Sequence, residues 1–212
     1  MIAILAAIAL MGQNTKDTYG KTNEQILAMG YNAWSDFYNA KAGVSTIAMS
    51  NAAGLYGDAL MARNDRLMKR LKPTESARFK RLRTSMLDFK NEAIGMGVSL
   101  TGGGTMWNPI AAGMQVDTET ALYRVLAGLT SKAPRRVVSD VTKVMAQLKG
   151  DLGKAKLDMN WPKVAKDSIA GTDKAFDSIV KEAKGLPRRD SDTILEFCRK
   201  ILVDIRETAT PK

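Results

Sequence analysis

Apolar residues recur at steps of three and four along most of the chain, and this spacing constrains the fold more than any other feature. The clearest stripe runs through Phe79, Leu82, Met86, Phe89, Ala93 and Met96. No run of β-branched residues alternates with polar ones, as a half-buried strand requires. The pattern predicts an all-α protein, an antiparallel helical bundle of about five to six helices.

A long helical hairpin is expected on the amino-terminal side, made of the segments 22–71 and 74–98. Pro73 separates them, because proline disfavours helix in the residue before it. Folding back at this proline would place residues equidistant from the turn side by side, with position 57 near position 89. The glycines that could interrupt the first segment are Gly43, Gly54 and Gly57.

Later helices are expected to begin at Asp117, at Pro134, at Trp161 and at Asp190 or Ser191. They complete a single helical domain over 13–212. The stretch 99–116 is rich in glycine and is interpreted as a loop, at which the domain could be subdivided.

Charge is unevenly distributed along the hairpin. The chain has 32 Lys and Arg against 22 Asp and Glu, a net charge of +10. Residues 63–92 hold ten cationic and four acidic side chains, whereas residues 42–57 and 93–116 hold none. We therefore expect a basic tip at the Pro73 turn and a charge-free base at the other end.

The basic tip is a candidate for contact with an anionic surface or an acidic protein partner. Its candidate binding residues are Arg63, Arg66, Lys69, Arg70, Arg78, Lys80, Arg81 and Arg83. A solvated helix face without a binding role is the alternative. The tip lacks interleaved aromatic residues, so any nucleic acid would be bound electrostatically and without sequence specificity.

The charge-free base is interpreted either as the centre of the fold or as a contact face for another subunit or a membrane surface. The stretch TGGGTMWNP lacks the G-K-[ST] of a phosphate-binding loop, and no strand precedes it. Glycines, Asn108 and Pro109 make 93–116 unsuitable as a membrane span. The interface candidates are Met106, Trp107 and Ile110. The oligomeric state is left open.

Residues 1–12 form an apolar amino-terminal segment. Its ten apolar residues, 2–11, would extend about 15 Å as a helix, half of a bilayer core. That length suits a cleaved export signal, although no Lys or Arg precedes the run. An uncleaved membrane-contacting helix and a buried terminal helix are the alternatives. Gln13 stands where a lipoprotein signal has its cysteine, which excludes lipidation.

The residue types argue against catalysis. The chain has no histidine, which removes the commonest general base and the usual zinc and haem ligands. Cys198 is the only cysteine, lies on an apolar helical stripe and is expected to be buried. Two carboxylate pairs, Asp88 with Glu92 and Asp204 with Glu207, have the spacing of surface helix pairs. No catalytic residue, metal site or cofactor is predicted.

The sequence therefore predicts a non-catalytic helical binding or structural protein that directs its basic tip towards an anionic surface. The lead hypothesis places it outside the cytoplasm, periplasmic, secreted or envelope-associated. One alternative is a cytoplasmic, nucleic-acid-associated basic protein. Another is a structural subunit that contacts its partners through 93–116. No resemblance to a known family accompanies these patterns.

Overall fold

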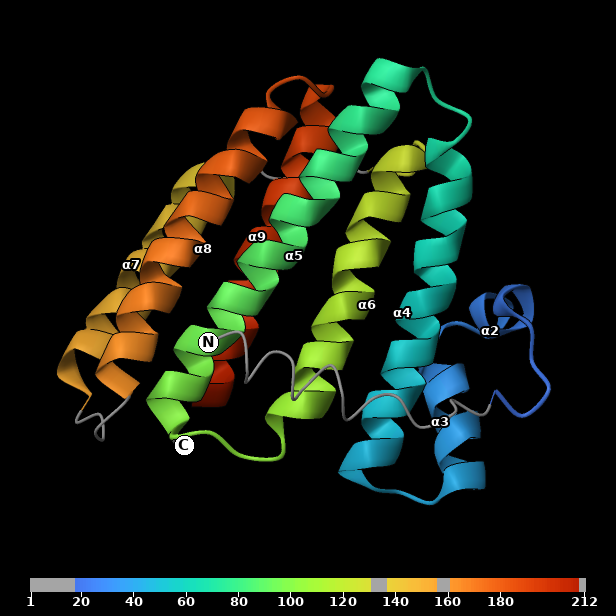
Figure 1. The fold of residues 1–212 in the computed structure, drawn as a ribbon, viewed down its shortest axis with the longest axis horizontal. Coiled ribbons are helices and arrows are strands. Elements are labelled where there is room, and N and C mark those ends of the chain that lie inside the picture. The colour runs from blue at the N-terminus through green and yellow to red at the C-terminus, as the bar shows by residue number, and fades with distance from the viewer. Residues whose placement is uncertain (1–17, 131–136, 156–160, 210–212) are drawn as a thin grey trace.

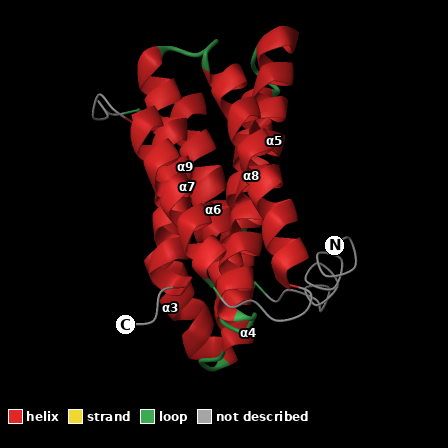
Figure 2. Ribbon diagram, turned by 90° about the vertical axis from the view of Figure 1, so that its left-hand side faces the viewer, coloured by secondary structure: helices red, strands yellow, loops and turns green. Residues whose placement is uncertain are grey.

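A computed structural model describes residues 18–130, 137–155 and 161–209. Within these ranges the chain forms eight helices and no strand, which confirms the all-α bundle. The helices are α2 (Asn23–Met29), α3 (Tyr31–Ala42), α4 (Thr46–Met68), α5 (Pro73–Thr101), α6 (Trp107–Leu126), α7 (Val137–Lys154), α8 (Trp161–Ala183) and α9 (Arg188–Ala209). From α4 onwards successive helices alternate in direction (Figure 1), and they run side by side along one axis (Figure 2). The apolar segment 1–12 and Pro134 lie outside the described residues.

The first predicted segment, 22–71, is not one helix but three. The capping box is present: Thr22 Oγ1 accepts from the Gln25 amide at 3.3 Å, and Gln25 Oε1 accepts from the Thr22 amide at 2.9 Å. Gly30 and Gly43 interrupt the segment with φ of 77° and 79°, a conformation that other residues rarely adopt. Gly43 was expected as a break, whereas Gly54 and Gly57 lie inside α4.

The expected helix at Asp117 in fact begins ten residues earlier, at Trp107. Gly102 ends α5 with φ of 70°, and only residues 102–106 separate α5 from α6. Pro109 lies in the first turn of α6, where its missing N–H has no intrahelical partner to lose. The loop prediction for 99–116 was therefore too long.

The predictions for α8, α9 and Cys198 agree more closely with the structure. Trp161 begins α8 as expected, whereas α9 begins at Arg188, two residues before the expected cap. Cys198 is buried, as its place on the apolar stripe of α9 predicted.

The predicted side-by-side packing of the hairpin is wrong. α4 and α5 are joined by the short turn before Pro73, but α6 lies between them (Figure 1). α4 packs mainly on α6, and α5 packs mainly on α8. A Cβ at Gly57 would contact Gln115 of α6, while the Phe89 ring lies 6.0 Å from that of Phe176 on α8.

The buried apolar residues form a main core, a smaller core and a small cluster between α4 and α6. The main core is built from α5 to α9 and includes the predicted α5 stripe from Leu82 to Met96. A smaller core lies among α2, α3 and α4 around Trp34, whose indole N–H donates to the Ala52 carbonyl at 2.8 Å. α6 contributes Leu122 to the main core, and Val116 to a small cluster with α4.

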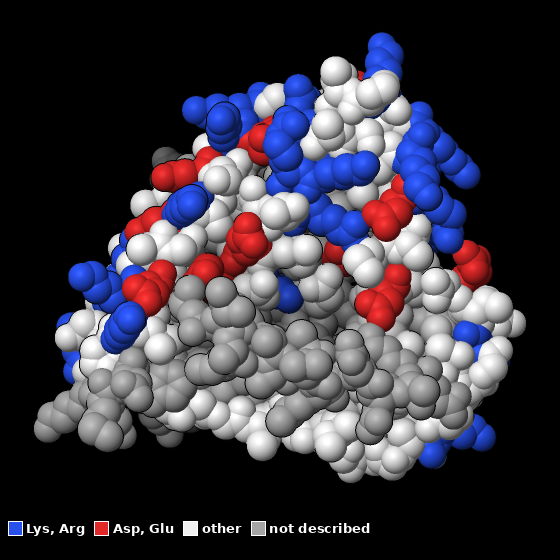
Figure 3. All heavy atoms as spheres, viewed as in Figure 1, with Lys and Arg blue, Asp and Glu red and all other residues white. Residues whose placement is uncertain are grey.

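The expected charge polarity survives the corrected packing, because α6 also begins with an uncharged stretch. The charge-free first half of α4 and the charge-free ends of α5 and α6 lie at one end of the bundle (Figure 1). The turn between α4 and α5 lies at the opposite end. Figure 3 shows Lys and Arg side chains gathered towards that end on the visible face.

Candidate functional site

Arg83 of the predicted basic tip is directed into the bundle. Its side chain is 13% exposed, Nη1 donates to Asp65 Oδ1 at 2.7 Å, and Nε donates to Glu119 Oε1 at 2.8 Å. Because Asp65 belongs to α4 and Glu119 to α6, this one guanidinium links three helices. Arg83 therefore has a packing role and is not part of an accessible cationic surface.

Three further arginines of the tip are engaged with acceptors from distant parts of the chain. Arg66 pairs with Glu24 at 2.8 Å, and Arg78 Nη1 donates to the Gly185 carbonyl at 2.7 Å. Arg81 donates to both carboxylate oxygens of Glu182 at 2.8 and 3.2 Å. These hydrogen bonds lower the pKa of the Glu182 carboxyl.

Four cations in or near the α4–α5 turn make no ion pair with any described residue. They are Lys69, Arg70, Lys72 and Lys80, all exposed, and we call them the tip cations. The sequence had singled out all of them except Lys72. Arg63, the eighth predicted residue, is exposed and lies over the Tyr123 ring with 4.7 Å between guanidinium carbon and ring centroid.

The three interface candidates lie at the α5–α6 connection, but only Met106 is exposed, at 53%. Trp107 is buried, and its indole N–H donates to Thr101 Oγ1 at 2.9 Å. Its ring occupies the space that Gly97 leaves open. Ile110 packs partly buried against the main core. Trp107 and Ile110 thus stabilise the start of α6 from within.

A buried polar cluster that the sequence did not reveal joins α4, α5 and α6. Its members are Asn64, Arg83, Lys90, Gln115 and Glu119. Glu119 is fully buried and accepts from Asn64 Nδ2 at 2.9 Å as well as from Arg83. Lys90 Nζ donates to Gln115 Oε1 at 3.0 Å.

Burial lowers the pKa of Lys90 to about 8, although the negative charge of Glu119 opposes this shift. Asn64 Oδ1 and Arg83 Nη2 are buried without a hydrogen-bond partner in the part of the chain that the structure describes. In the sequence the residues of this cluster resemble ordinary polar and charged residues of a helix surface, because their partners come from other helices.

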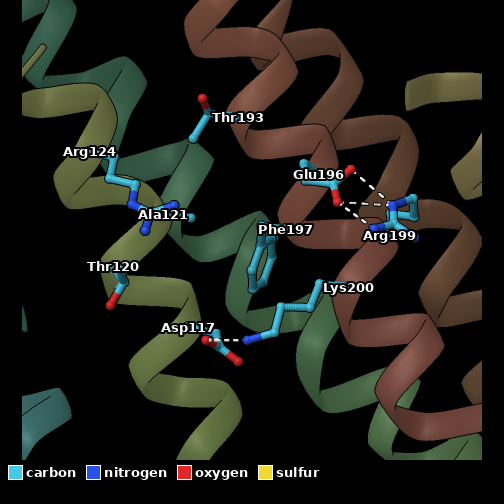
Figure 4. Close-up of a pocket in the computed structure, with 9 residues that line it drawn as sticks. All are labelled: Asp117, Thr120, Ala121, Arg124, Thr193, Glu196, Phe197, Arg199 and Lys200. Atoms are coloured by element: carbon cyan, nitrogen blue, oxygen red, sulfur yellow. Dashed lines mark hydrogen bonds and ion pairs between the residues drawn. The ribbon is translucent and has the colours of Figure 1, made fainter. Parts of the chain in front are cut away.

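A pocket of about 320 Å³ opens between α6 and α9 (Figure 4). The residues that line it are Asp117, Thr120, Ala121, Arg124, Thr193, Glu196, Phe197, Arg199 and Lys200. They recur at helical steps on both helices, which places them on facing surfaces. The sequence contains this spacing but does not show that α6 and α9 are neighbours.

Four of the five charged side chains around the pocket are paired with each other. Lys200 Nζ donates to Asp117 Oδ1 at 2.7 Å, and Arg199 forms a forked ion pair with Glu196 (Figure 4). Arg124 is exposed and forms no ion pair with a described residue. The pocket therefore carries one uncompensated positive charge.

In each of the two carboxylate pairs noted in the sequence one member is exposed, Asp88 or Glu207, and the other, Glu92 or Asp204, is partly buried. Burial and the neighbouring Asp88 raise the pKa of Glu92, which lies against Gly171 of α8. Burial also raises the pKa of Asp204, against the lowering effect of Lys200. No group of three or more potential metal ligands occurs among the described residues. None of the helices in the described ranges has the length and apolar character of a membrane span.

Comparison with known proteins gives no match, whether with family models, with curated protein sequences or with solved structures.

Proposed function

We propose that this chain is a non-catalytic helical protein that binds an anionic surface through the tip cations, Lys69, Arg70, Lys72 and Lys80. The observation that carries the proposal is that all four are exposed and without ion pairs among the described residues, three of them in the α4–α5 turn and Lys80 about two helical turns into α5. Unpaired cations attract an anionic surface without first having to break an intramolecular bond.

The neighbouring hydrogen bonds of Arg78 and Arg81 support this assignment. Arg78 and Arg81 hold α5 to the end of α8 through Gly185 and Glu182, so the turn is carried on a fixed scaffold. A lysine or arginine near an anionic bilayer contributes about 1 kcal/mol to binding. Four such residues at one end give a surface whose binding depends on salt and on the anionic fraction, and not on sequence readout.

Non-catalytic action agrees with the residue chemistry. The chain contains no histidine, and burial raises the pKa of the Cys198 thiol, which disfavours the nucleophilic thiolate.

The test is co-sedimentation with vesicles of phosphatidylcholine containing phosphatidylserine, and with phosphatidylcholine alone. Replacing the four tip cations with Glu should reduce binding to the anionic vesicles by at least about tenfold, because four favourable contributions become repulsive. The matched control replaces Lys41, Lys154, Lys163 and Lys166 with Glu, since these exposed lysines lie at helix ends away from the α4–α5 turn.

Each replacement changes the charge by two units, so both fourfold variants fall from +10 to +2. An equal loss of vesicle binding in the two variants would show that binding depends on the total charge and not on the tip cations. Absence of wild-type binding to anionic vesicles would also contradict the proposal. Tighter, tip-dependent binding to duplex DNA would favour the nucleic-acid alternative instead.

We further propose that the protein acts outside the cytoplasm, as an exported or envelope-associated protein. The support is the apolar run of residues 2–11, which has the length of the apolar core of a secretory signal. Mass spectrometry of the native protein should find a chain that starts near Gln13. An intact Met1 in a cytosolic fraction contradicts export.

A further inference from the structure

We propose that the pocket between α6 and α9 binds a small organic carboxylate, an acid group attached to a short apolar body. The proposal goes beyond the anionic-surface function, because it uses Arg124 and none of the four tip cations. It rests on the charge, the donors and the floor of the pocket.

Arg124 is the group that receives the carboxylate. The other two cations of the pocket are engaged, Lys200 with Asp117 and Arg199 with Glu196. In Figure 4 the Arg124 guanidinium is drawn beside α6 next to Ala121, with no ion pair drawn to it. A guanidinium presents two parallel N–H donors, which match the two oxygens of a carboxylate.

One unpaired cation fits one negative charge. A phosphate dianion would meet only a single uncompensated positive charge and would lie beside the carboxylates of Asp117 and Glu196. The hydroxyl group of Thr120 offers a neutral hydrogen-bond donor, whereas that of Thr193 on the opposite wall already donates to the Arg189 carbonyl at 2.9 Å. The pocket is therefore suited to a monoanion.

The floor of the pocket is apolar. Ala121 of α6 and Phe197 of α9 line it, and both are mostly buried by the main core. A ligand that carries an apolar group next to its acid can cover this surface and gain from its removal from water. The volume of about 320 Å³ is at the lower end of the range for small-molecule sites.

The experiment is a titration of the full chain with benzoate, followed through the backbone amide signals of α6 and α9 in ¹H–¹⁵N NMR spectra. Ionic strength is kept constant with sodium chloride. Benzoate should cause saturable shifts of the amides near Arg124 and Thr193. Acetate, which has the acid without the apolar body, and inorganic phosphate should each bind at least about tenfold more weakly.

Arg124→Gln should weaken benzoate binding about tenfold or more, since it removes a charge-assisted hydrogen bond. Thr120→Val keeps the shape of the side chain but removes the neutral donor, and it should weaken binding less. Arg70→Gln removes the same charge from the tip and should leave benzoate binding unchanged. Because vesicle binding is measured separately, failure of this proposal is distinguishable from failure of the anionic-surface proposal.

Shifts that never saturate overturn the proposal, and so does a dissociation constant that Arg124→Gln leaves unchanged. Phosphate binding as tight as that of benzoate would overturn the assigned ligand class.

Discussion

The two faces of α6 attach this helix to its neighbours by different means. One face carries Met114, Leu122 and Val125 into the main apolar core with α5 and α9. The opposite face meets α4 through Val116 and through the buried Glu119. The first contact is mainly apolar, with the partly exposed Asp117–Lys200 ion pair beside it, whereas the second is built around a buried carboxylate with specific partners.

The apolar contact holds α6 against its neighbours, whereas the polar contact fixes how the helices are aligned. Apolar burial stabilises roughly in proportion to the area removed from water and has little directional preference. A buried carboxylate has a strong directional requirement, because losing a partner leaves a charged group unsatisfied. Glu119 has its partners in Asn64 on α4 and Arg83 on α5, so it fixes how α4, α5 and α6 are aligned.

The largest effect is expected when the polar face is broken. Glu119→Ala leaves the guanidinium of Arg83 without one of its two carboxylate partners and the amide of Asn64 without an acceptor side chain. We expect the free energy of unfolding to fall by about 3–5 kcal/mol, as for other buried pairs that lose one partner. Urea unfolding followed by circular dichroism measures this change.

Glu75→Ala is the control, since Glu75 is an exposed carboxylate in the first turn of α5. Its effect should stay within about 1 kcal/mol. A Glu119→Ala variant as stable as this control would show that the polar face does not hold α6 in place.

The same difference explains which helices the sequence predicted well. α8 and α9 bury one face, so their apolar residues form a single stripe, and Ile194, Cys198, Ile201 and Ile205 are all buried as expected. α6 is covered on two sides, and its buried positions include Thr118 and Glu119. A helix with two buried faces lacks a simple stripe, so nothing in the pattern outweighed the glycines of 99–116, and its first half was interpreted as a loop.

The candidate sites, too, could be predicted from the sequence only in part. The basic tip was visible because its cations are close together in sequence. Which of them stay unpaired was not visible, because Glu24, Glu182 and Gly185 reach the tip from 42 to 107 residues away. The pocket residues of α6 and α9 are also far apart in the chain. Only the packing of the two helices brings them together.

A smaller effect is expected on the apolar face of α6. In Gly97→Ala the added methyl group would clash with Cη2 of Trp107 and would lie 2.9 Å from a methyl group of Ile205. Both neighbours are buried, so the overpacked core should lose about 1–3 kcal/mol of unfolding free energy. Chemical denaturation of the variant measures the loss.

Gly113→Ala is the matched control, because a Cβ at Gly113 of α6 meets nothing within 4 Å. It should stabilise the helix by up to about 1 kcal/mol, the ordinary difference between Gly and Ala. The double variant Gly97→Ala, Trp107→Leu should be less destabilised than the sum of its single changes, since the smaller side chain makes room. Strict additivity would mean that Trp107 does not press against Gly97.

The smallest expected effect is a pH dependence of the free energy of unfolding that comes from Lys90 on the polar face of α6. Because the pKa of Lys90 is lowered to about 8 in the folded chain, the unfolded chain binds more protons at this residue above that pH. The Lys90 contribution to the free energy of unfolding should therefore rise by about 1 kcal/mol between pH 7 and 9.

Burial of Cys198 has the opposite effect in this window, because its raised pKa keeps the folded thiol protonated. The difference between wild type and Lys90→Met removes the cysteine contribution, which both chains share.

Wild type should gain stability relative to Lys90→Met as the pH rises from 7 to 9, while an exposed control, Lys80→Met, should show no such trend. Tyr31 and Tyr56, whose pKa values are raised, titrate above this window. A flat difference between wild type and Lys90→Met would mean that water reaches Lys90 and that the polar face of α6 is open to solvent. A rising difference would mean that water is excluded from the polar face of α6, as it is from the apolar face. The free-energy cost of leaving a buried charge unpaired would then keep α4, α5 and α6 aligned.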